Sequence, residues 1–355
     1  MNLAIVSRKL SGRGGMETVI KTISQTATAE NIPCTLWAMG QLNDKQWLAN
    51  VSYKEANIDQ GTGRRMQLRA KLPLYIMALV RFLKDSAVDT LLATDPLFVE
   101  ASYRARQVLR RPIRIISWLH FSVDKLANTT SLIKADGHIA ISRGIERQLR
   151  TLKVSAPIYV VHNPLPYAFN STSPQELSLN RLLYVGRLNN HQKRLDLLFE
   201  ALAQVKSAWA LDIKGDGPDG GWLKRLAQDL SINNRVHFTG WQQNPWVPPG
   251  PRALVLTSDF EGFPMVLVEA LARGIPVIAT NCPTGPEDIV DDHKNGLLIP
   301  TGSISAIRDA LITALAPEWP WAWSPQEIQD NALSHFNAAQ VFKNMVEAIN
   351  SIPLK

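Results

Sequence analysis

The chain has 355 residues, of which 45% are hydrophobic and 19% are charged. This length is enough for roughly two domains with separate cores, and the composition excludes an intrinsically disordered chain. The two cysteines, Cys34 and Cys282, cannot form a disulfide framework. No window approaches the about 18 uninterrupted apolar residues of a membrane span, and the opening run is too short for a secretory signal. We therefore expect a cytoplasmic protein.

The net charge of +7 is divided unevenly along the chain. Residues 1–165 contain 23 Lys and Arg against 12 Asp and Glu, whereas residues 166–355 contain 15 against 19. The basic residues gather in two stretches of the first half: Arg64, Arg65, Arg69 and Lys71, then Arg104, Arg106, Arg110, Arg111 and Arg114. Such patches indicate an anionic partner, namely nucleic acid, an anionic membrane surface or a phosphorylated glycolipid, although a solvated face would look the same. No nucleic-acid module is recognisable, so we expect no nucleic-acid partner.

The first half alternates apolar runs with helical stretches. Residues 2–6 read as a buried strand, and a Gly-rich loop at 11–15 with Gly14 and Gly15 leads into a helix over 16–26. The loop lacks the P-loop and Gly-x-Gly-x-x-Gly spacings, so the glycines fit a plain tight turn as well as they fit a phosphate-binding site. Further strands are expected at 34–39, 88–93, 113–119, 137–141 and 157–161. This alternation predicts a parallel sheet covered on both faces.

Polar residues stand at three strand ends of this half, namely Asp95, His120 and Ser142. In open α/β sheets the ligand crevice lies outside the carboxyl ends of the strands, so these positions are candidates for a site. His120 in the run SWLHF can be a buried structural histidine, or it can face a sugar or phosphate as a donor or acid/base group.

Residues 162–178 contain three prolines without periodicity and read as a linker. A second α/β half follows. Its strand 181–185 feeds a loop with Gly186, Arg187 and Lys193 before a helix from about 194, which is either a diphosphate clamp or a basic surface loop. Gly215 follows a strand expected at 210–214. Further strands are expected at 235–239, 252–257, 276–280 and 297–300. Helices are expected at 303–316 and 325–350. Two such halves predict a crevice between domains.

The stretch 257–276, TSDFEGFPMVLVEALARGIP, carries two carboxylates, Glu261 and Glu269. Pro264 fits the first turn of a helix, so a helix should start near residue 264. The free N–H groups and positive dipole end of such a helix bind anions, and carboxylates beside it would suit sugar hydroxyls. A solvated helix would explain the same pair.

Taken together, these motifs make the second half similar to the nucleotide-sugar domain of glycosyltransferase family 4, which has retaining enzymes with the two-domain GT-B fold. The matching runs are YVGRL with Lys193, KGDGP at 214–218, the stretch 257–280, PTGPEDI and NGLLIP. Gly-Trp at 240–241, Pro-Trp at 245–246 and CPTGP at 282–286 resemble bacterial lipopolysaccharide core hexosyltransferases, including the galactosyltransferase type. One departure is VPPGP at 247–251, where relatives have a helix.

The resemblance implies roles for individual residues. Arg187 and Lys193 would hold the donor diphosphate, Glu261 the transferred sugar and Glu269 the ribose. The catalytic set would be His120, Glu261, Arg187 and Lys193, and the donor would also contact Gly14, Gly15, Gly186, Gly215, Gly262, Phe263, Met265, Val266 and Leu267. No cofactor or catalytic metal is expected, because cationic side chains and helix N–H groups can neutralise the leaving diphosphate.

The alternation of strands and helices predicts an α/β protein, and the resemblance implies the GT-B fold, with two Rossmann-like domains facing each other across a cleft. Residues 1–165 would bind the acceptor, 166–330 the nucleotide sugar, and the C-terminal helix in 331–355 would pack back on the first domain. The expected reaction is retaining transfer of glucose or galactose from UDP-hexose to the lipopolysaccharide core, at the cytoplasmic face of the inner membrane. Alternatives are capsule, exopolysaccharide or O-antigen assembly from UDP-GlcNAc or another nucleotide sugar, or a UDP-sugar epimerase or phosphorylase.

Overall fold

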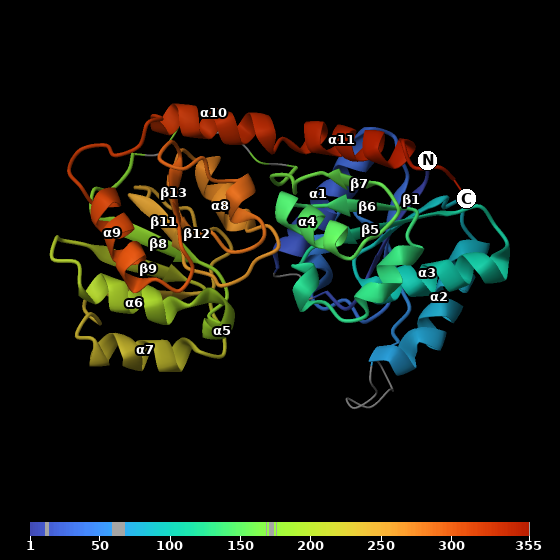
Figure 1. Ribbon diagram of the computed structural model, residues 1–355, viewed down its shortest axis with the longest axis horizontal. Coiled ribbons are helices and arrows are strands. Elements are labelled where there is room, and N and C mark those ends of the chain that lie inside the picture. The colour runs from blue at the N-terminus through green and yellow to red at the C-terminus, as the bar shows by residue number, and fades with distance from the viewer. Residues whose placement is uncertain (11–13, 59–67, 168, 170–173, 175, 355) are drawn as a thin grey trace. The chain divides into compact units, whose positions relative to one another are not determined.

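The computed structural model of the chain describes residues 1–10, 14–58, 68–167, 169, 174 and 176–354. The chain divides into two compact units, Met1–Phe169 with Phe336–Lys355 and Asn170–His335, drawn in Figure 1. The predicted Gly-rich loop residues 11–13, Arg64, Arg65 and parts of the predicted linker lie outside the described residues.

The first unit is built on a parallel sheet with the strand order β3-β2-β1-β4-β5-β6-β7 in its described residues. The strands are β1 Leu3–Ser7, β2 Cys34–Ala38, β3 Ser52–Glu55, β4 Thr90–Ala93, β5 Arg114–Leu119, β6 Gly137–Ala140 and β7 Ile158–Val160. The residues of β1 and β4 are all buried, as expected for strands that helices cover on both faces.

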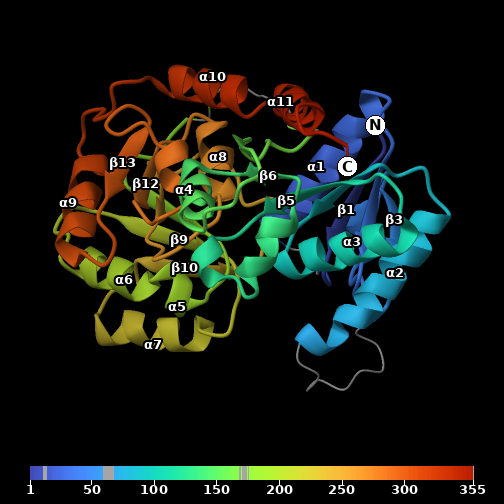
Figure 2. The same ribbon diagram turned by 45° about the vertical axis from the view of Figure 1, so that its right-hand side comes forward.

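Five α-helices flank this sheet in the described residues: α1 Gly15–Ala29, α2 Leu72–Lys84, α3 Pro96–Leu109, α4 Arg143–Thr151 and α11 Ala338–Asn350. Helix α1 packs with α11, and α2 packs with α3. Both views place these two pairs on opposite sides of the sheet (Figures 1 and 2). Short 3₁₀ turns cover Lys45–Leu48, Leu68–Lys71, Val123–Lys125 and Thr129–Lys134.

The second unit repeats this architecture with the strand order β10-β9-β8-β11-β12-β13, again all parallel. Its strands are β8 Arg181–Val185, β9 Ala210–Lys214, β10 Val236–Gly240, β11 Ala253–Leu256, β12 Val277–Thr280 and β13 Gly296–Ile299. Its helices are α5 Asn190–Lys193, α6 Leu195–Ala203, α7 Gly220–Asp229, α8 Met265–Leu271, α9 Ile304–Ala314 and α10 Pro325–His335, with a 3₁₀ turn at Pro286–Asp288.

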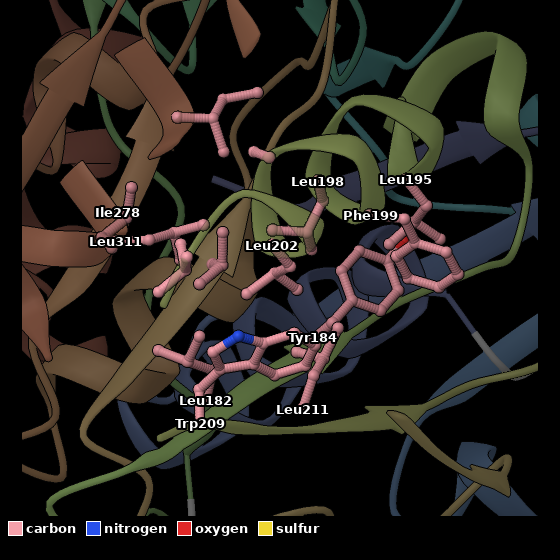
Figure 3. Packing of buried hydrophobic residues seen from close by; sticks show 14 of the residues in the cluster. Leu182, Tyr184, Leu195, Leu198, Phe199, Leu202, Trp209, Leu211, Ile278 and Leu311 are labelled. Atoms are coloured by element: carbon pink, nitrogen blue, oxygen red, sulfur yellow. The ribbon is translucent and has the colours of Figure 1, made fainter. Parts of the chain in front are cut away.

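The core of the second unit forms where alternate strand residues meet the helices on one face of the sheet. Leu182 and Tyr184 of β8 and Leu211 of β9 pack against Leu198 and Leu202 of α6 (Figure 3). All five side chains are fully buried. Because side chains alternate across a strand, the intervening residues of β8 and β9 point to the opposite face of the sheet.

Two parallel α/β sheets confirm the predicted fold class. The prediction of one helix over 325–350 is wrong, because α10 ends at His335 and α11 begins at Ala338. Asn337 causes the break, since its side chain accepts hydrogen bonds from the backbone N–H groups of Ala339 and Gln340 and starts a new helix. Helix α11 then packs on α1 and β6 within the first unit.

Candidate active site

The candidate site lies where the strand order of the second sheet reverses. The chain runs outward from β8 through β9 to β10, then returns to the other side of β8 as β11. The loops after β8 and β11 therefore leave the sheet side by side at its carboxyl edge, which is where open α/β sheets bind ligands. Helix α5 belongs to the first loop, and residues 257–264 form the second.

Lys193 and Glu261 form an ion pair between these two loops. The ammonium Nζ donates a hydrogen bond to Glu261 Oε1 at 2.6 Å, and both side chains are largely shielded from solvent. Ser258 Oγ donates to the same carboxylate oxygen, also at 2.6 Å. Because an ammonium has three N–H bonds and a carboxylate has two oxygens, both groups keep capacity for a ligand.

Hydrogen bonds to backbone carbonyls also hold the two loops together. Thr257 Oγ1 donates to the carbonyl oxygens of Lys193 and Arg194, at 2.9 and 3.0 Å. Gln192 Nε2 donates to Phe260 O, and Asp259 N–H donates to Gln192 O. The position of the Lys193 and Glu261 side chains is therefore fixed by rigid backbone rather than by their mutual attraction alone.

A third loop, after β12, supports Glu261 from the other side. Thr284 Oγ1 donates to the backbone carbonyl of Glu261. Gly285 has a φ of +97°, and a Cβ there would lie 2.6 Å from Pro264 Cδ and 2.9 Å from Gly262 O. Only glycine at position 285 allows this loop to approach the turn at residues 262–264 so closely.

Arg187 extends from the loop after β8. Its side chain is exposed, and its guanidinium has no ion-pair partner among the described residues. The buried Tyr184 hydroxyl donates to Arg187 O at 3.0 Å and so fixes the loop backbone. Burial and the nearby Glu261 charge both raise the pKa of Tyr184, which keeps this hydroxyl protonated as a donor. Among the described residues, Arg187 is thus an unpaired cation on an ordered loop.

Gly186 and Gly215 bring the loops after β8 and β9 into backbone contact. A Cβ at Gly215 would lie 1.8 Å from Gly186 O, so no larger residue fits. The neighbouring backbone hydrogen bonds run from Gly186 N to Lys214 O and from Gly215 N to Gly240 O. The sequence interpretation gave these glycines to the donor, and the structure shows that one of them is needed for packing between loops.

Glu269 lies in the last part of α8 beside two residues that the sequence analysis did not assign to the site. Burial raises the pKa of its carboxyl, while Arg273 and a hydrogen bond from the Trp246 indole act in the opposite direction. The Arg273 guanidinium stacks over the Trp246 ring at 4.6 Å. Burial likewise lowers the pKa of Arg273 to about 10. Trp246 thus connects the Glu269 carboxyl with the guanidinium that stacks on its ring.

The segment VPPGP, residues 247–251, forms a loop where the sequence analysis noted that relatives have a helix. It contains no helix, and a cavity of about 310 Å³ lies between residues 242–251 and strands β8, β9 and β10. Lys214 Nζ donates to Pro245 O at 2.7 Å and holds the loop near the carboxyl edge. Trp246 forms part of the lining.

Helix α8 differs from the sequence expectation in length and start. It covers only Met265–Leu271, and Pro264 precedes it with extended ψ instead of occupying its first turn. The N–H group of Leu267 donates to Pro264 O, so it is already occupied by a hydrogen bond within the protein. The side chains of Met265 and Leu267 are buried, and that of Val266 is half-buried. Because the helix has less than two full turns, its dipole is small, and the positive charge at this edge of the sheet comes mainly from Lys193 and Arg187.

The candidates of the first unit lie at the carboxyl edge of its own sheet. Gly14 is the N-cap of α1 and Gly15 its first residue. Ser142 caps α4 by accepting from Ile145 N–H, which gives it a structural role. His120 follows β5, is 6% exposed and stacks edge-on against Trp118 at 4.3 Å.

His120 has an unusual environment for a buried polar side chain. Neither ring nitrogen has a hydrogen-bond partner in the described part of the chain. Burial lowers its pKa to about 3, so the imidazole is neutral at physiological pH. It therefore suits hydrogen bonding to a hydroxyl better than donation of a proton as an acid.

The residues that sequence reasoning missed are Ser258, Thr284, Trp246 and Arg273. The two hydroxyls carry little sequence signal, because serine and threonine occur in most loops. Within the described ranges no group of three or more His, Cys, Asp or Glu residues is arranged to hold a metal ion. No helix in these ranges is both long and apolar enough to cross a membrane.

Two parallel-sheet α/β units, the second with an ion pair between loops at its switch point, fit the GT-B fold. Residues 171–332 match the family model described as glycosyl transferases group 1. The chain is 33% identical to the lipopolysaccharide 1,6-galactosyltransferase of Salmonella typhimurium, over 99% of both chains. The enzyme of the same name from Escherichia coli K12 is 34% identical over 90% of both. The chain therefore belongs to the glycosyl transferases group 1 family.

Solved structures agree with this assignment. The apo form of the lipopolysaccharide outer core galactosyltransferase WaaB superimposes with a TM-score of 0.84, at 32% identity and 99% coverage of both chains. Anabaena Alr3699/HepE in complex with UDP and glucose gives a TM-score of 0.79 at 20% identity, over 99% of this chain and 100% of that one, and shows the same fold.

Proposed function

We propose that this glycosyltransferase moves a hexose, glucose or galactose, from UDP-hexose to a sugar of the lipopolysaccharide core, with retention of configuration. The observation that carries the proposal is the Lys193–Glu261 pair, which holds a cation and a carboxylate together on loops after β8 and β11. A donor needs both, because its diphosphate is anionic and its sugar presents hydroxyls. The full-length similarity to lipopolysaccharide 1,6-galactosyltransferases supports the choice of hexose and acceptor.

The donor would lie along the carboxyl edge of the second sheet. Lys193 and the unpaired Arg187 bind the diphosphate, and the free Glu261 oxygen accepts hydrogen bonds from the transferred sugar. Glu269 holds the ribose hydroxyls, with the uracil beside Trp246. The lining of a cavity by Trp246 and the hydrogen bond between its indole and Glu269 support this order of subsites.

The reaction breaks the bond between the sugar C1 and the diphosphate oxygen and forms a bond from C1 to the acceptor oxygen on the same face. The departing diphosphate oxygen takes the acceptor's proton, so UDP leaves with its charge neutralised by Lys193 and Arg187. Preorganised cations of this kind lower the barrier because they need no reorientation as charge develops. Neutral His120 donates a hydrogen bond to the donor sugar and orients it.

These two cations do the work that a divalent ion performs in other transferases, so the reaction proceeds without a metal. Transfer rates should be the same with and without EDTA, and a loss that added Mg²⁺ or Mn²⁺ restores would contradict this point.

The basic first unit would bind the anionic acceptor or the anionic face of the inner membrane from the cytoplasmic side. Its exposed cations are screened by salt within about 10 Å at 0.1 M. Transfer to a membrane-bound acceptor should therefore fall with salt more steeply than hydrolysis of UDP-hexose. Equal salt dependence of the two reactions would count against this partner.

The test is to incubate the enzyme with a panel of UDP-sugars and core acceptors truncated stepwise, and to read the products by mass spectrometry. We expect hexose transfer from UDP-galactose or UDP-glucose, with an anomeric configuration in the product, measured by NMR, equal to that of the donor. Transfer of N-acetylglucosamine to another glycan would indicate capsule, exopolysaccharide or O-antigen assembly instead. Conversion of the UDP-sugar without any acceptor product would indicate an epimerase, and phosphate-dependent cleavage a phosphorylase.

A further inference from the structure

The first sheet has the same reversal of strand order as the second, between β1 and β4. The segments that follow these two strands leave the sheet side by side, and each carries one member of an ion pair. Arg8 follows β1, Asp95 follows β4, and Arg8 Nη2 donates to Asp95 Oδ2 at 2.7 Å. An opposite-charge pair thus occupies the switch point of each sheet, Arg8–Asp95 in one and Lys193–Glu261 in the other. Switch points are where open α/β sheets bind their ligands.

The local fold does not account for the charge of this pair. Asp95 caps α3, because its Oδ1 accepts from Leu97 N–H at 2.9 Å. A neutral Asn caps a helix as well as Asp does, so the cap does not require a carboxylate or a partner for it. Arg8 uses one nitrogen on Asp95, and its Nε is buried without a hydrogen-bond partner among the described residues.

Other buried polar groups without a partner among the described residues lie at the same edge of this sheet. The Ser7 hydroxyl is fully buried, and in the described ranges it has no hydrogen-bond partner. His120, with two unpartnered nitrogens, follows β5, which pairs with β4. Folded proteins satisfy about 90% or more of such buried groups, so several vacancies at one sheet edge point to a ligand that supplies the missing partners.

The charge of the pair indicates what kind of ligand fits. Arg8 and Asp95 together are neutral, and a phosphate placed on Arg8 would meet the Asp95 carboxylate. A sugar hydroxyl both donates and accepts, so neighbouring hydroxyls can donate to Asp95 and accept from Arg8 and Ser7. Neutral carbohydrate is therefore favoured over an anion at this point, in contrast to the cationic loop of the second unit.

We infer that Arg8, Asp95 and Ser7 form the subsite that binds hydroxyls of the acceptor sugar. This inference rests on the proposed function, because it names the acceptor side of that same reaction. Asp95 and Arg8 touch the acceptor and set its orientation next to His120. Ser7 contributes a hydrogen bond that exists only when the acceptor is bound.

The decisive variant is Asp95→Asn, which keeps the helix cap and removes the charge. We expect the KM for a truncated core oligosaccharide to rise roughly tenfold or more, since hydrogen bonds to charged groups contribute about 1.5–3 kcal/mol. The KM for UDP-hexose should change less than twofold. Asp89→Asn is the matched control, because Asp89 lies at the opposite, amino edge of the same sheet and bonds to Asn2 and Thr90.

Ser7→Ala separates binding from folding. The lost hydroxyl has no hydrogen-bond partner among the described residues, so the thermal midpoint should not fall, whereas the acceptor KM should rise about threefold to tenfold. Ser102→Ala is the matched control, since Ser102 is equally buried and unpartnered but lies within α3. Its acceptor KM should equal that of the wild type.

Three outcomes would overturn the inference while leaving the proposed function intact: wild-type acceptor KM in Asp95→Asn, equal effects of Ser7→Ala and Ser102→Ala, or a lower acceptor KM in Asp95→Asn. The last would indicate a phosphate at Arg8. Failure of the wild-type enzyme to transfer hexose to any core oligosaccharide would instead contradict the proposed function. Calorimetric titration of the same oligosaccharide into wild-type and Asp95→Asn protein would then still test the subsite.

Discussion

Glu261 and Lys193 are 68 positions apart in the chain, yet their side chains meet at 2.6 Å, and the pair is nearly buried. Such a pair is costly to desolvate, and its contribution to stability alone is small. Its placement at the switch point of the second sheet supports the role in donor binding that we propose for it. The consequences can be tested by changing each side of the pair separately.

Replacing Lys193 with Gln should remove the positive charge while keeping a hydrogen-bond donor. The leaving diphosphate would lose one of its two cations, so kcat should fall roughly 100-fold or more, the range seen when one preorganised donor is removed. Steady-state kinetics with saturating acceptor measures this. Lys206→Gln, at an exposed position of the same unit, is the control. Wild-type turnover in Lys193→Gln would remove this residue from the site, and charge reversal to Glu should give the larger loss.

Ser258→Ala should weaken the hold on the Glu261 carboxylate. The removed hydroxyl donates to the same carboxylate oxygen that Lys193 contacts, and its loss costs about 1 kcal/mol, which corresponds to roughly a fivefold rise in the donor Kd. Isothermal titration with UDP-hexose measures the change. The double variant with Lys193→Gln should show coupling, because both groups act on one atom. Strictly additive effects would mean that Ser258 does not act through Glu261.

Gly215→Ala should destabilise the second unit. The added Cβ would meet the Gly186 carbonyl at 1.8 Å, and two backbone segments would have to separate. Overpacking of this kind costs about 1–3 kcal/mol, which lowers the thermal midpoint by several degrees. Gly221→Ala is the control, since a Cβ there would meet only Arg225 Nη1 at 4.0 Å, an ordinary contact, and alanine favours the helix α7. Similar midpoints for the two variants would contradict the predicted clash.

The sequence was sufficient for most of the fold. Strands 181–185 and 210–214 were predicted with the bounds that the structure has, because apolar runs ended by glycine leave little ambiguity. Strand β3 was missed, since Ser52–Glu55 is polar and partly exposed at the edge of the sheet. Pro264 was predicted to lie in the first turn of a helix, but it precedes helix α8, because proline is compatible with either position.

The site was less predictable than the fold. Lys193 and Glu261 could be named from motifs, but their direct contact depends on how two loops cross after distant strands. The Trp246–Arg273 stack was not foreseen, because the loop after β10 departs from the expected helix and carries the tryptophan to α8. The vacant hydrogen-bonding groups at Ser7 and His120 have no sequence signature, since they depend on what surrounds each side chain.

Two buried histidines of the first unit should make its stability depend on pH. Burial lowers the pKa of His120 to about 3 and that of His138 to about 4, from 6.5. Above pH 6.5 neither the folded nor the unfolded chain protonates them, so the full stability is present. As pH falls below 6.5 only the unfolded chain takes up these protons. The free energy of unfolding should then drop by about 1.4 kcal/mol per pH unit for each histidine until the folded chain protonates too.

Chemical denaturation at pH values between 4.5 and 7.5 measures this slope. His138→Asn is the informative variant, because its amide can keep the hydrogen bond that links Nδ1 to Ser117 Oγ at 2.6 Å and it does not titrate. The slope should become shallower by one histidine's share, while exposed His237→Asn in the second unit should leave it unchanged. If His138→Asn and the wild type lose stability in parallel on acidification, the His138 imidazole must already be protonated in the folded chain. The same measurement would then be needed for His120→Asn, because the proposed role of His120 in orienting the sugar requires a neutral imidazole.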